Sequence, residues 1–170
     1  MKIKSAVINL SLGFLGSLLV SNFPQYLGFN PEKASAQTPS CPLSADIAVT
    51  FLNSECKEVV LDKPQNFYRY FGNNVSKYGR YLTSDQYKTN VEVIRNLALD
   101  QSWQPPNPAS MKVTVTLPAG TTVYQGIVAP QNPAFCYPGG GQQTFIKDSR
   151  DPNIKWSEGE SITVELFSCP

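Results

Sequence analysis

The sequence predicts an α+β fold: a single domain stapled by disulfides, with a mixed or antiparallel sheet in its C-terminal half and helices mainly in its N-terminal half. Residues 112–117 alternate between apolar and polar side chains, as a half-buried strand does. Residues 89–100 instead have apolar residues at helical spacing. Because the strand and helix signals are segregated rather than alternating, the pattern favours the α+β class.

The N-terminus has the features of a secretory leader. Lys2 and Lys4 precede an apolar run over residues 6–20, and residues 34–36 read Ala-Ser-Ala, a form that leader peptidases cleave. We therefore expect residues 1–36 to be a signal peptide and residues 37–170 to be the mature domain, secreted or periplasmic. The apolar run is shorter than the roughly twenty residues of a comfortable membrane span, so a permanent anchor is the weaker alternative.

The charge balance excludes some partners. The chain has 14 basic and 13 acidic residues, and loss of the leader removes Lys2, Lys4, Lys33 and Glu32, which leaves eleven against twelve. A net charge near −1 without a basic block argues against a general nucleic-acid or anionic-membrane binder. Neither class of partner is expected.

The four cysteines predict two disulfides. Cys41, Cys56, Cys136 and Cys169 all follow the leader, and an even number in an exported chain is typical of paired cysteines. Three connectivities are possible, and spacing does not choose between them. With no CxxC spacing and no histidine, no metal site is expected.

The elements follow in chain order. Residues 45–52 fit a helix or a strand, and the aromatic stretch at 67–72 fits a strand. In the helix at 89–100, Thr89 and Glu92 form a capping box, and Val91 and Ile94 are expected to face the core. Residues 101–110 are a proline-rich linker. Further strands are expected at 112–117, 121–129, 143–147 and 162–168, the second running back from a turn at 118–120.

Three consecutive glycines stand out between two of these strands. Gly139, Gly140 and Gly141 lack a Cβ atom, so a ligand can approach the backbone closely beside the neutral amide of Gln143. A ligand clamp is one interpretation of this segment. A plain glycine turn between strands is the other.

The order of these motifs resembles a known family, the tuberculosis necrotizing toxin domain. The resemblance covers about residues 67–146, and it is carried by Arg69, Tyr70 and Gly72, by residues 79–82, by Arg95 and Leu97, by the alternating strand, by Gly126, Ala129 and Pro130, and by Gly139–Gly141 with Gln143. No single motif is specific, whereas six in the same order are moderately so.

This resemblance implies a secreted NAD glycohydrolase, which releases nicotinamide and ADP-ribose. Bacterial toxins and fungal surface enzymes share the domain, and this chain looks closer to the secreted fungal kind because no long carrier precedes it. It implies that Gln143 and Arg69 are the catalytic residues. NAD would be the substrate, with no separate cofactor. The chain departs from the mycobacterial toxin in having no histidine.

The chemistry of the reaction assigns the remaining residues. Nicotinamide leaves as a neutral pyridine, so the step needs no general acid, but it needs a cation for the pyrophosphate and a flat surface for the ring. Arg69 and Arg95 suit the first role because guanidinium forks match phosphate oxygens. Substrate contacts are expected from Tyr70, Phe71, Tyr81, Arg95, Gly139, Gly140 and Gly141.

Two other functions remain open. The triplet Glu158-Gly159-Glu160 matches the paired glutamates of arginine-specific ADP-ribosyltransferases. A non-enzymatic binding module, whose glycine loop touches a glycan or a protein, is the alternative from another class. The oligomeric state is not indicated by any pattern in the chain.

Overall fold

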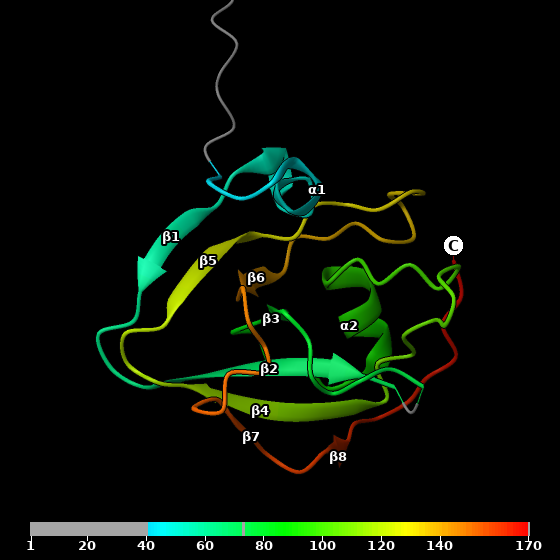
Figure 1. Ribbon diagram of the computed structural model, residues 1–170. Helices are drawn as coiled ribbons and strands as arrows, with labels where there is room; N and C mark the ends of the chain where they lie inside the picture. The colour runs from blue at the N-terminus through cyan, green and yellow to red at the C-terminus, as the bar shows by residue number, and fades with distance from the viewer. Residues whose placement is uncertain (1–40, 73, 170) are drawn as a thin grey trace, which may run out of the picture. The chain divides into compact units, whose positions relative to one another are not determined.

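Two small antiparallel sheets and two short helices form the described body of the protein (Figure 1). The computed structural model describes residues 41–72 and 74–169, so the expected signal peptide at 1–36 lies outside the described residues. The elements are α1 (Ala45–Ala48), the 3-10 turn η1 (Leu52–Ser54), β1 (Lys57–Val60), β2 (Gln65–Phe71), β3 (Tyr81–Leu82), α2 (Asn90–Asn96), β4 (Met111–Leu117), β5 (Thr122–Ile127), β6 (Gln142–Phe145), β7 (Lys155–Trp156) and β8 (Glu160–Ser161).

The strands divide into two sheets. The first has the order β1-β5-β6-β3, and the second has the order β2-β4-β7, with β8 also pairing to β4. All of these pairs are antiparallel, which confirms the α+β class and the antiparallel sheet. α1 and η1 precede β1, whereas α2 lies between β3 and β4, so the helices do not form a separate N-terminal block.

The turn at residues 118–120 carries the chain from one sheet to the other. β4 pairs with β2, whereas β5 pairs with β1 and β6, so β5 does not run back along β4. Leu61, in the β1–β2 connection, donates its N–H to the carbonyl of Thr121 and accepts from the N–H of Gly120. Both connections therefore cross between the sheets at one corner, on the left of Figure 1. Gly120 has a φ of 83°, which a glycine adopts without strain.

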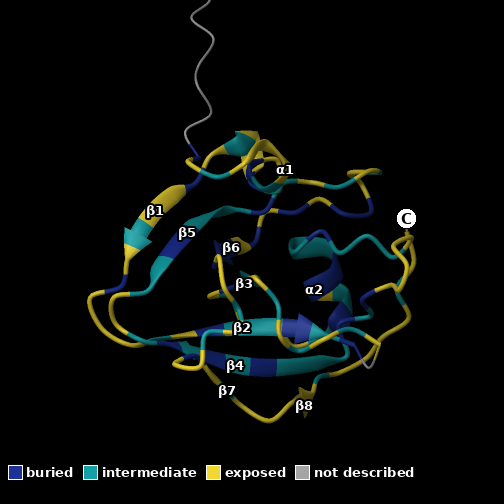
Figure 2. Cartoon of the chain, viewed as in Figure 1, coloured by how far each residue is buried: buried dark blue, intermediate teal, exposed yellow. Residues whose placement is uncertain are grey.

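Three clusters of buried side chains hold the elements together. One lies between the sheets and includes Phe67, Val113, Val115 and Leu117, which are 0–2 % exposed. A second surrounds α2, and a third joins the N-terminal segment to β5 and β6 through Phe51, Tyr124 and Phe145. In Figure 2 the buried colour follows β2, β4 and α2, while β8 is exposed. None of the helices in the described ranges is long and apolar enough to span a membrane.

Helix α2 begins as the sequence predicts and ends earlier. The Thr89 side chain accepts from the Glu92 N–H, and the Glu92 carboxylate accepts from the Thr89 N–H, which confirms the capping box. Val93 and Ile94 are buried, whereas Val91 is only partly buried. The prediction that Ile94 faces the core is confirmed, and the same prediction for Val91 was wrong. Because the helix has only seven residues, its buried face is set by neighbours at both ends rather than by a long apolar stripe.

The predicted strand at 162–168 is absent from the described C-terminal segment. Only Glu160 and Ser161 pair with β4, and the chain then passes over the start of α2. There the Asn90 side chain accepts from the Glu165 N–H at 2.7 Å and donates to the Glu165 carbonyl at 3.2 Å. Ile162 and Phe167 pack on the α2 cluster, whereas Val164 and Leu166 are exposed.

Two disulfides close the fold, and they resolve the connectivity that the sequence left open. Cys41 pairs with Cys56, and Cys136 pairs with Cys169. The first bridge ties the N-terminal segment to the start of β1. The second ties the C-terminal segment to the loop before β6.

We predict that removing either bridge by paired Cys→Ser substitution lowers the free energy of unfolding by about 2–5 kcal/mol. The Cys136–Cys169 bridge spans 33 positions against 15 for Cys41–Cys56, so its loss should cost about 0.7 kcal/mol more, from loop-closure entropy. Urea unfolding of both double variants beside the oxidised wild type measures these differences. An unchanged midpoint for both variants would contradict the prediction.

Candidate active site

A cavity of about 370 Å³ lies where β2, β3, β6 and the segments after α1, α2 and β5 meet. This volume falls within the usual range of small-molecule sites. Its lining consists of Thr50, Tyr68, Arg69, Tyr70, Val75, Tyr81, Leu82, Leu97, Ala98, Leu99, Trp103, Pro105, Asn107, Val128, Ala129, Gln131, Gln142 and Gln143. Four of the sequence-predicted site residues, Arg69, Tyr70, Tyr81 and Gln143, therefore come together here.

Arg69 is the only charged side chain in this lining. Its two terminal nitrogens donate to the backbone carbonyls of Tyr81 and Ser76, both at 3.3 Å, and its buried Nε has no hydrogen-bond partner. Among the described residues it forms no ion pair, and burial lowers the pKa of its guanidinium. An arginine remains charged at neutral pH, so the cavity holds a cation that no protein carboxylate neutralises.

Gly79 provides the space in which Arg69 lies. A Cβ atom at this position would stand 2.2 Å from the Arg69 Cζ and 2.6 Å from its Nε. Any larger residue would therefore displace the guanidinium. The Gly-Arg-Tyr-Leu motif of the sequence includes this glycine, but only the structure shows that its missing side chain makes room for the Arg69 guanidinium.

Gln143 lies on β6, opposite Gly126 of β5, and is 7 % exposed. Its side-chain nitrogen donates to the Thr50 hydroxyl at 2.8 Å and to the Thr50 carbonyl at 3.4 Å. None of the described hydrogen bonds ends on its side-chain oxygen, which is thus available to a ligand or to water. Gln143 and Arg69 come from different sheets, and the cavity brings them to one lining.

Aromatic rings form a second part of the lining. Tyr81 packs edge-on against Phe145, and Tyr70 packs at 5.6 Å against Tyr87. The Tyr70 hydroxyl accepts from the Tyr87 N–H, so its role is to hold the wall, and burial raises its pKa. Trp103 also lines the cavity, is 44 % exposed and lies outside the helices and strands. A large apolar ring left in water at a cavity mouth is available for stacking.

A hydrogen-bonded network of Tyr87, Asp85 and the Gln142 backbone supports the cavity lining. Tyr87 donates its hydroxyl to Asp85 at 2.9 Å, and the same carboxylate accepts from the Gln142 N–H at 2.7 Å. Burial and the neighbouring Asp85 raise the pKa of Tyr87, so it stays a neutral donor. This network fixes the first residue of β6 and hence the position of Gln143.

The other predicted site residues lie outside this lining. Phe71 packs against the core between the sheets, and Arg95 donates to the Phe135 carbonyl at 3.3 Å. The three glycines bond to scaffold: Gly139 and Gly141 donate to the carbonyls of Arg95 and Asn96, and Gly140 donates to that of Val128.

The glycine segment thus satisfies the last carbonyls of α2, which have no partner within the helix. A Cβ at Gly139 would stand 2.6 Å from the Val128 carbonyl oxygen, and one at Gly141 would stand 2.5 Å from the Tyr87 hydroxyl. Close approach of neighbouring atoms explains the absence of a side chain at Gly139 and Gly141, whereas Gly140 has a φ of 93° and open space at its Cβ position. The segment thereby docks the end of α2 on the loop before β6.

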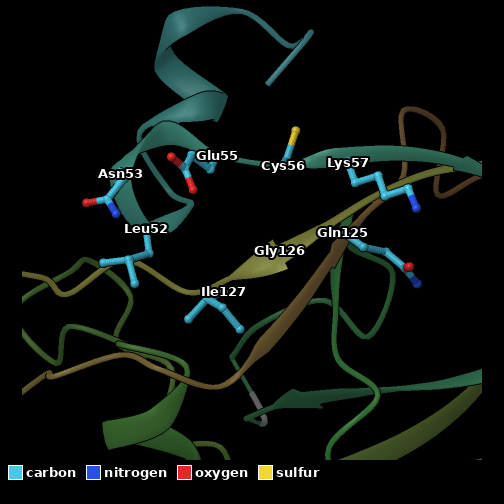
Figure 3. Close-up of a pocket in the computed structure, with 8 residues that line it drawn as sticks. All are labelled: Leu52, Asn53, Glu55, Cys56, Lys57, Gln125, Gly126 and Ile127. Carbon is cyan, nitrogen blue, oxygen red and sulfur yellow. The ribbon is translucent and has the colours of Figure 1, made fainter. Parts of the chain in front are cut away.

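Other hollows carry less chemistry. A pocket of about 350 Å³ beside the Cys41–Cys56 bridge is lined by Leu52, Asn53, Glu55, Cys56, Lys57, Gln125, Gly126 and Ile127 (Figure 3). It contains no aromatic residue and none of the predicted site residues. In the part of the chain that the structure describes, no three His, Cys, Asp or Glu side chains gather to hold a metal ion. The Asp148 and Asp151 carboxylates accept from backbone N–H groups of their own turns.

Thr50 and Trp103 are two of the lining residues that the sequence analysis did not assign to a site. Thr50 lies just after α1 and reaches Gln143 across 93 positions of sequence. Trp103 belongs to the proline-rich stretch that reads as a linker. Neither carries a local signal of function, because each acquires its place only through long-range contacts.

The comparisons with known proteins concern the fold. No family model matches the chain, and no curated protein matches it. The structure of Tne2 in complex with Tni2 superimposes with a TM-score of 0.54 at 17 % identity, over 65 % of this chain and 95 % of that one. The structure of Rhs1-CT in complex with its cognate immunity protein RhsI1 superimposes with a TM-score of 0.48 at 12 % identity, over 64 % of this chain and 83 % of that one. The similarity to Tne2 shows a shared fold and nothing more. The similarity to Rhs1-CT is too low to show a shared fold.

We predict that Gly141→Ala destabilises the protein, whereas Gly140→Ala costs only the strain of its φ of 93°, about 1 kcal/mol. No atom lies within 4 Å of a Cβ at Gly140, and Gly141 has no positive φ, so the first variant tests crowding and the second tests backbone strain. Thermal melting of both variants measures the difference. Equal melting temperatures would show that the segment is not the packed scaffold described above.

Proposed function

We propose that this protein is an NAD glycohydrolase, which hydrolyses the bond between nicotinamide and ribose. The observation that carries the proposal is the unneutralised Arg69 cation in the cavity wall. A partly buried guanidinium without a carboxylate is costly for the free protein, and it suits a site that receives an anion. The pyrophosphate of NAD is such an anion, and each terminal nitrogen of Arg69 has an N–H beyond the one that bonds to the backbone.

The composition of the lining fits this reaction better than other hydrolytic reactions. No Asp, Glu, Cys or His lines the cavity. Most glycosidases need two carboxylates, and acyl hydrolases need an activated nucleophile with a base. Cleavage of NAD is different because the departing nitrogen begins cationic and leaves neutral. The step then requires orientation and charge placement, which amides and one arginine can supply.

The residues divide these tasks among themselves. Arg69 binds the pyrophosphate and keeps the ribose within the cavity, while Tyr81 and Trp103 offer ring faces for the nicotinamide and adenine groups. Gln143 turns its free side-chain oxygen to the ribose hydroxyls or to the attacking water. An amide is a poor base at neutral pH, so Gln143 contributes by orientation.

Independent lines support the proposal at different levels. The ordered motifs that resemble the tuberculosis necrotizing toxin domain include Arg69 and Gln143, which line the cavity, and Gly79, beside which Arg69 lies. The fold shared with Tne2 is compatible with it. We further propose that the chain is exported through the leader at 1–36 and becomes fully active once its disulfides close. Its kinship with the secreted fungal enzymes stays a prediction.

The transferase alternative receives no support from the cavity. Glu158 and Glu160 are exposed and absent from the lining, and Glu160 pairs with Lys112 at 2.7 Å. The Glu160 carboxylate is therefore engaged on the surface between β8 and β4, and Glu158 lies outside the cavity.

We predict that the wild-type protein releases nicotinamide from NAD without any acceptor, and that Gln143→Ala lowers kcat about a hundredfold. Chromatography of the products measures both results, and circular dichroism checks that the variant is folded. Product formation only with an arginine-containing acceptor would favour the transferase. A folded wild type with no product would leave the non-enzymatic module.

We predict that Arg69→Met abolishes the rise in melting temperature that ADP-ribose causes, without lowering the melting temperature of the free protein. A methionine removes a buried charge that has no carboxylate partner, so the free fold loses little. Arg69→Lys should restore little binding, because a lysine cannot form the two-pronged contact. Arg150→Met, on an exposed turn outside the cavity, is the matched control. Equal stabilisation of wild type and Arg69→Met by ADP-ribose would sink the assignment.

A further inference from the structure

We infer that Thr50 is the positioning residue of Gln143: its hydroxyl and carbonyl decide which end of the glutamine amide faces the cavity. The inference deepens the proposed function and rests on it for the catalytic consequence. The two residues are joined by hydrogen bonds of 2.8 and 3.4 Å, and both line the cavity.

Proton counting shows why only one amide orientation is satisfied. The Thr50 hydroxyl has one proton, which it donates to the Ile47 carbonyl at 2.8 Å. Its oxygen can then only accept from Gln143. The Thr50 carbonyl is likewise an acceptor, and it also receives the Ala129 N–H at 2.9 Å. Facing two acceptors, the amide must present its NH₂ group to Thr50.

The reverse orientation is disfavoured. A primary amide turned by 180° would set its oxygen against the lone pairs of the Thr50 carbonyl, and the hydroxyl could reach that oxygen only by turning its proton away from the Ile47 carbonyl. Both hydrogen bonds of the amide NH₂ group would be lost in a buried place, where an unsatisfied polar group costs about 1–3 kcal/mol. The amide oxygen is therefore held toward the ligand before the ligand arrives, and this is the preorganisation that catalysis by orientation requires.

Thr50 itself is held from both sides. Its N–H donates to the Ile47 carbonyl at 3.0 Å, so the residue closes the turn that follows α1. The Cys41–Cys56 bridge encloses this segment, and the next residue, Phe51, is 1 % exposed within the N-terminal cluster. The N-terminal segment is thus a positioning element for a catalytic side chain on β6.

The kinetic test compares Thr50→Val with Thr50→Ser. The valine keeps the shape and loses the hydroxyl, so we expect kcat to fall about tenfold while KM stays within twofold; the serine should keep at least half of kcat. In a Gln143→Ala background the valine should cause no further loss, since its effect passes through Gln143. Thr116→Val is the control, because it removes a hydroxyl that bonds to Asn66 outside the cavity.

A second measurement is independent of turnover. In ¹⁵N-labelled wild type, assigned with Gln143→Ala, the Gln143 side-chain NH₂ protons should exchange at least tenfold more slowly than those of the exposed Gln142. Thr50→Val should remove this protection and Thr50→Ser should keep it. If the wild type releases no nicotinamide, the proposed function fails, and the exchange rates still decide the role of Thr50. Unprotected wild-type protons, or a valine variant that keeps both protection and kcat, would overturn the inference.

Discussion

An arginine without a carboxylate is the constraint around which the candidate site is arranged. Arg69 stays charged beside an apolar floor because backbone carbonyls at Ser76 and Tyr81 accept from it and because Gly79 leaves room for its guanidinium. A protein selected only for stability would pair or remove such a charge. Its retention in a cavity that has no other charged side chain is understandable when a phosphate completes the arrangement. The aromatic rings and amides of the cavity lining are then arranged around the Arg69 cation.

The scaffold assembles this arrangement from distant pieces. Arg69 stands on β2 in one sheet and Gln143 on β6 in the other, so their relation depends on how the sheets meet. The corner at Leu61 sets that relation on one side of the domain. On another, the three glycines dock the end of α2 against the loop before β6. Each disulfide secures a segment that would otherwise be held by few contacts: the one that carries Thr50, and the one that covers the start of α2.

Local patterns predicted local structure well. The alternation in β4 and the capping box of α2 are short-range effects of side chains on their own backbone, and both were found. The order of the motifs reflects a whole fold, so it predicted residues that lie in one cavity lining: Arg69, Tyr70, Tyr81 and Gln143. The sheet change after β4, the role of Thr50 and the place of Trp103 depend on contacts between remote segments, for which no local pattern exists. The glycines show the same limit, since a missing Cβ signals close approach without saying of what.

The bond between Thr50 and Gln143 has a consequence for the timing of synthesis. Its partners are 93 positions apart, and the loop between them contains most of the cavity wall. A nascent chain that has emerged only as far as β5 has the arginine but lacks β6, and a truncated product that ends there has no orienting amide. Loop closure over such a span comes late in folding, after local turns and helices. A polypeptide that is still emerging from the ribosome therefore has no formed site until β6 is in place.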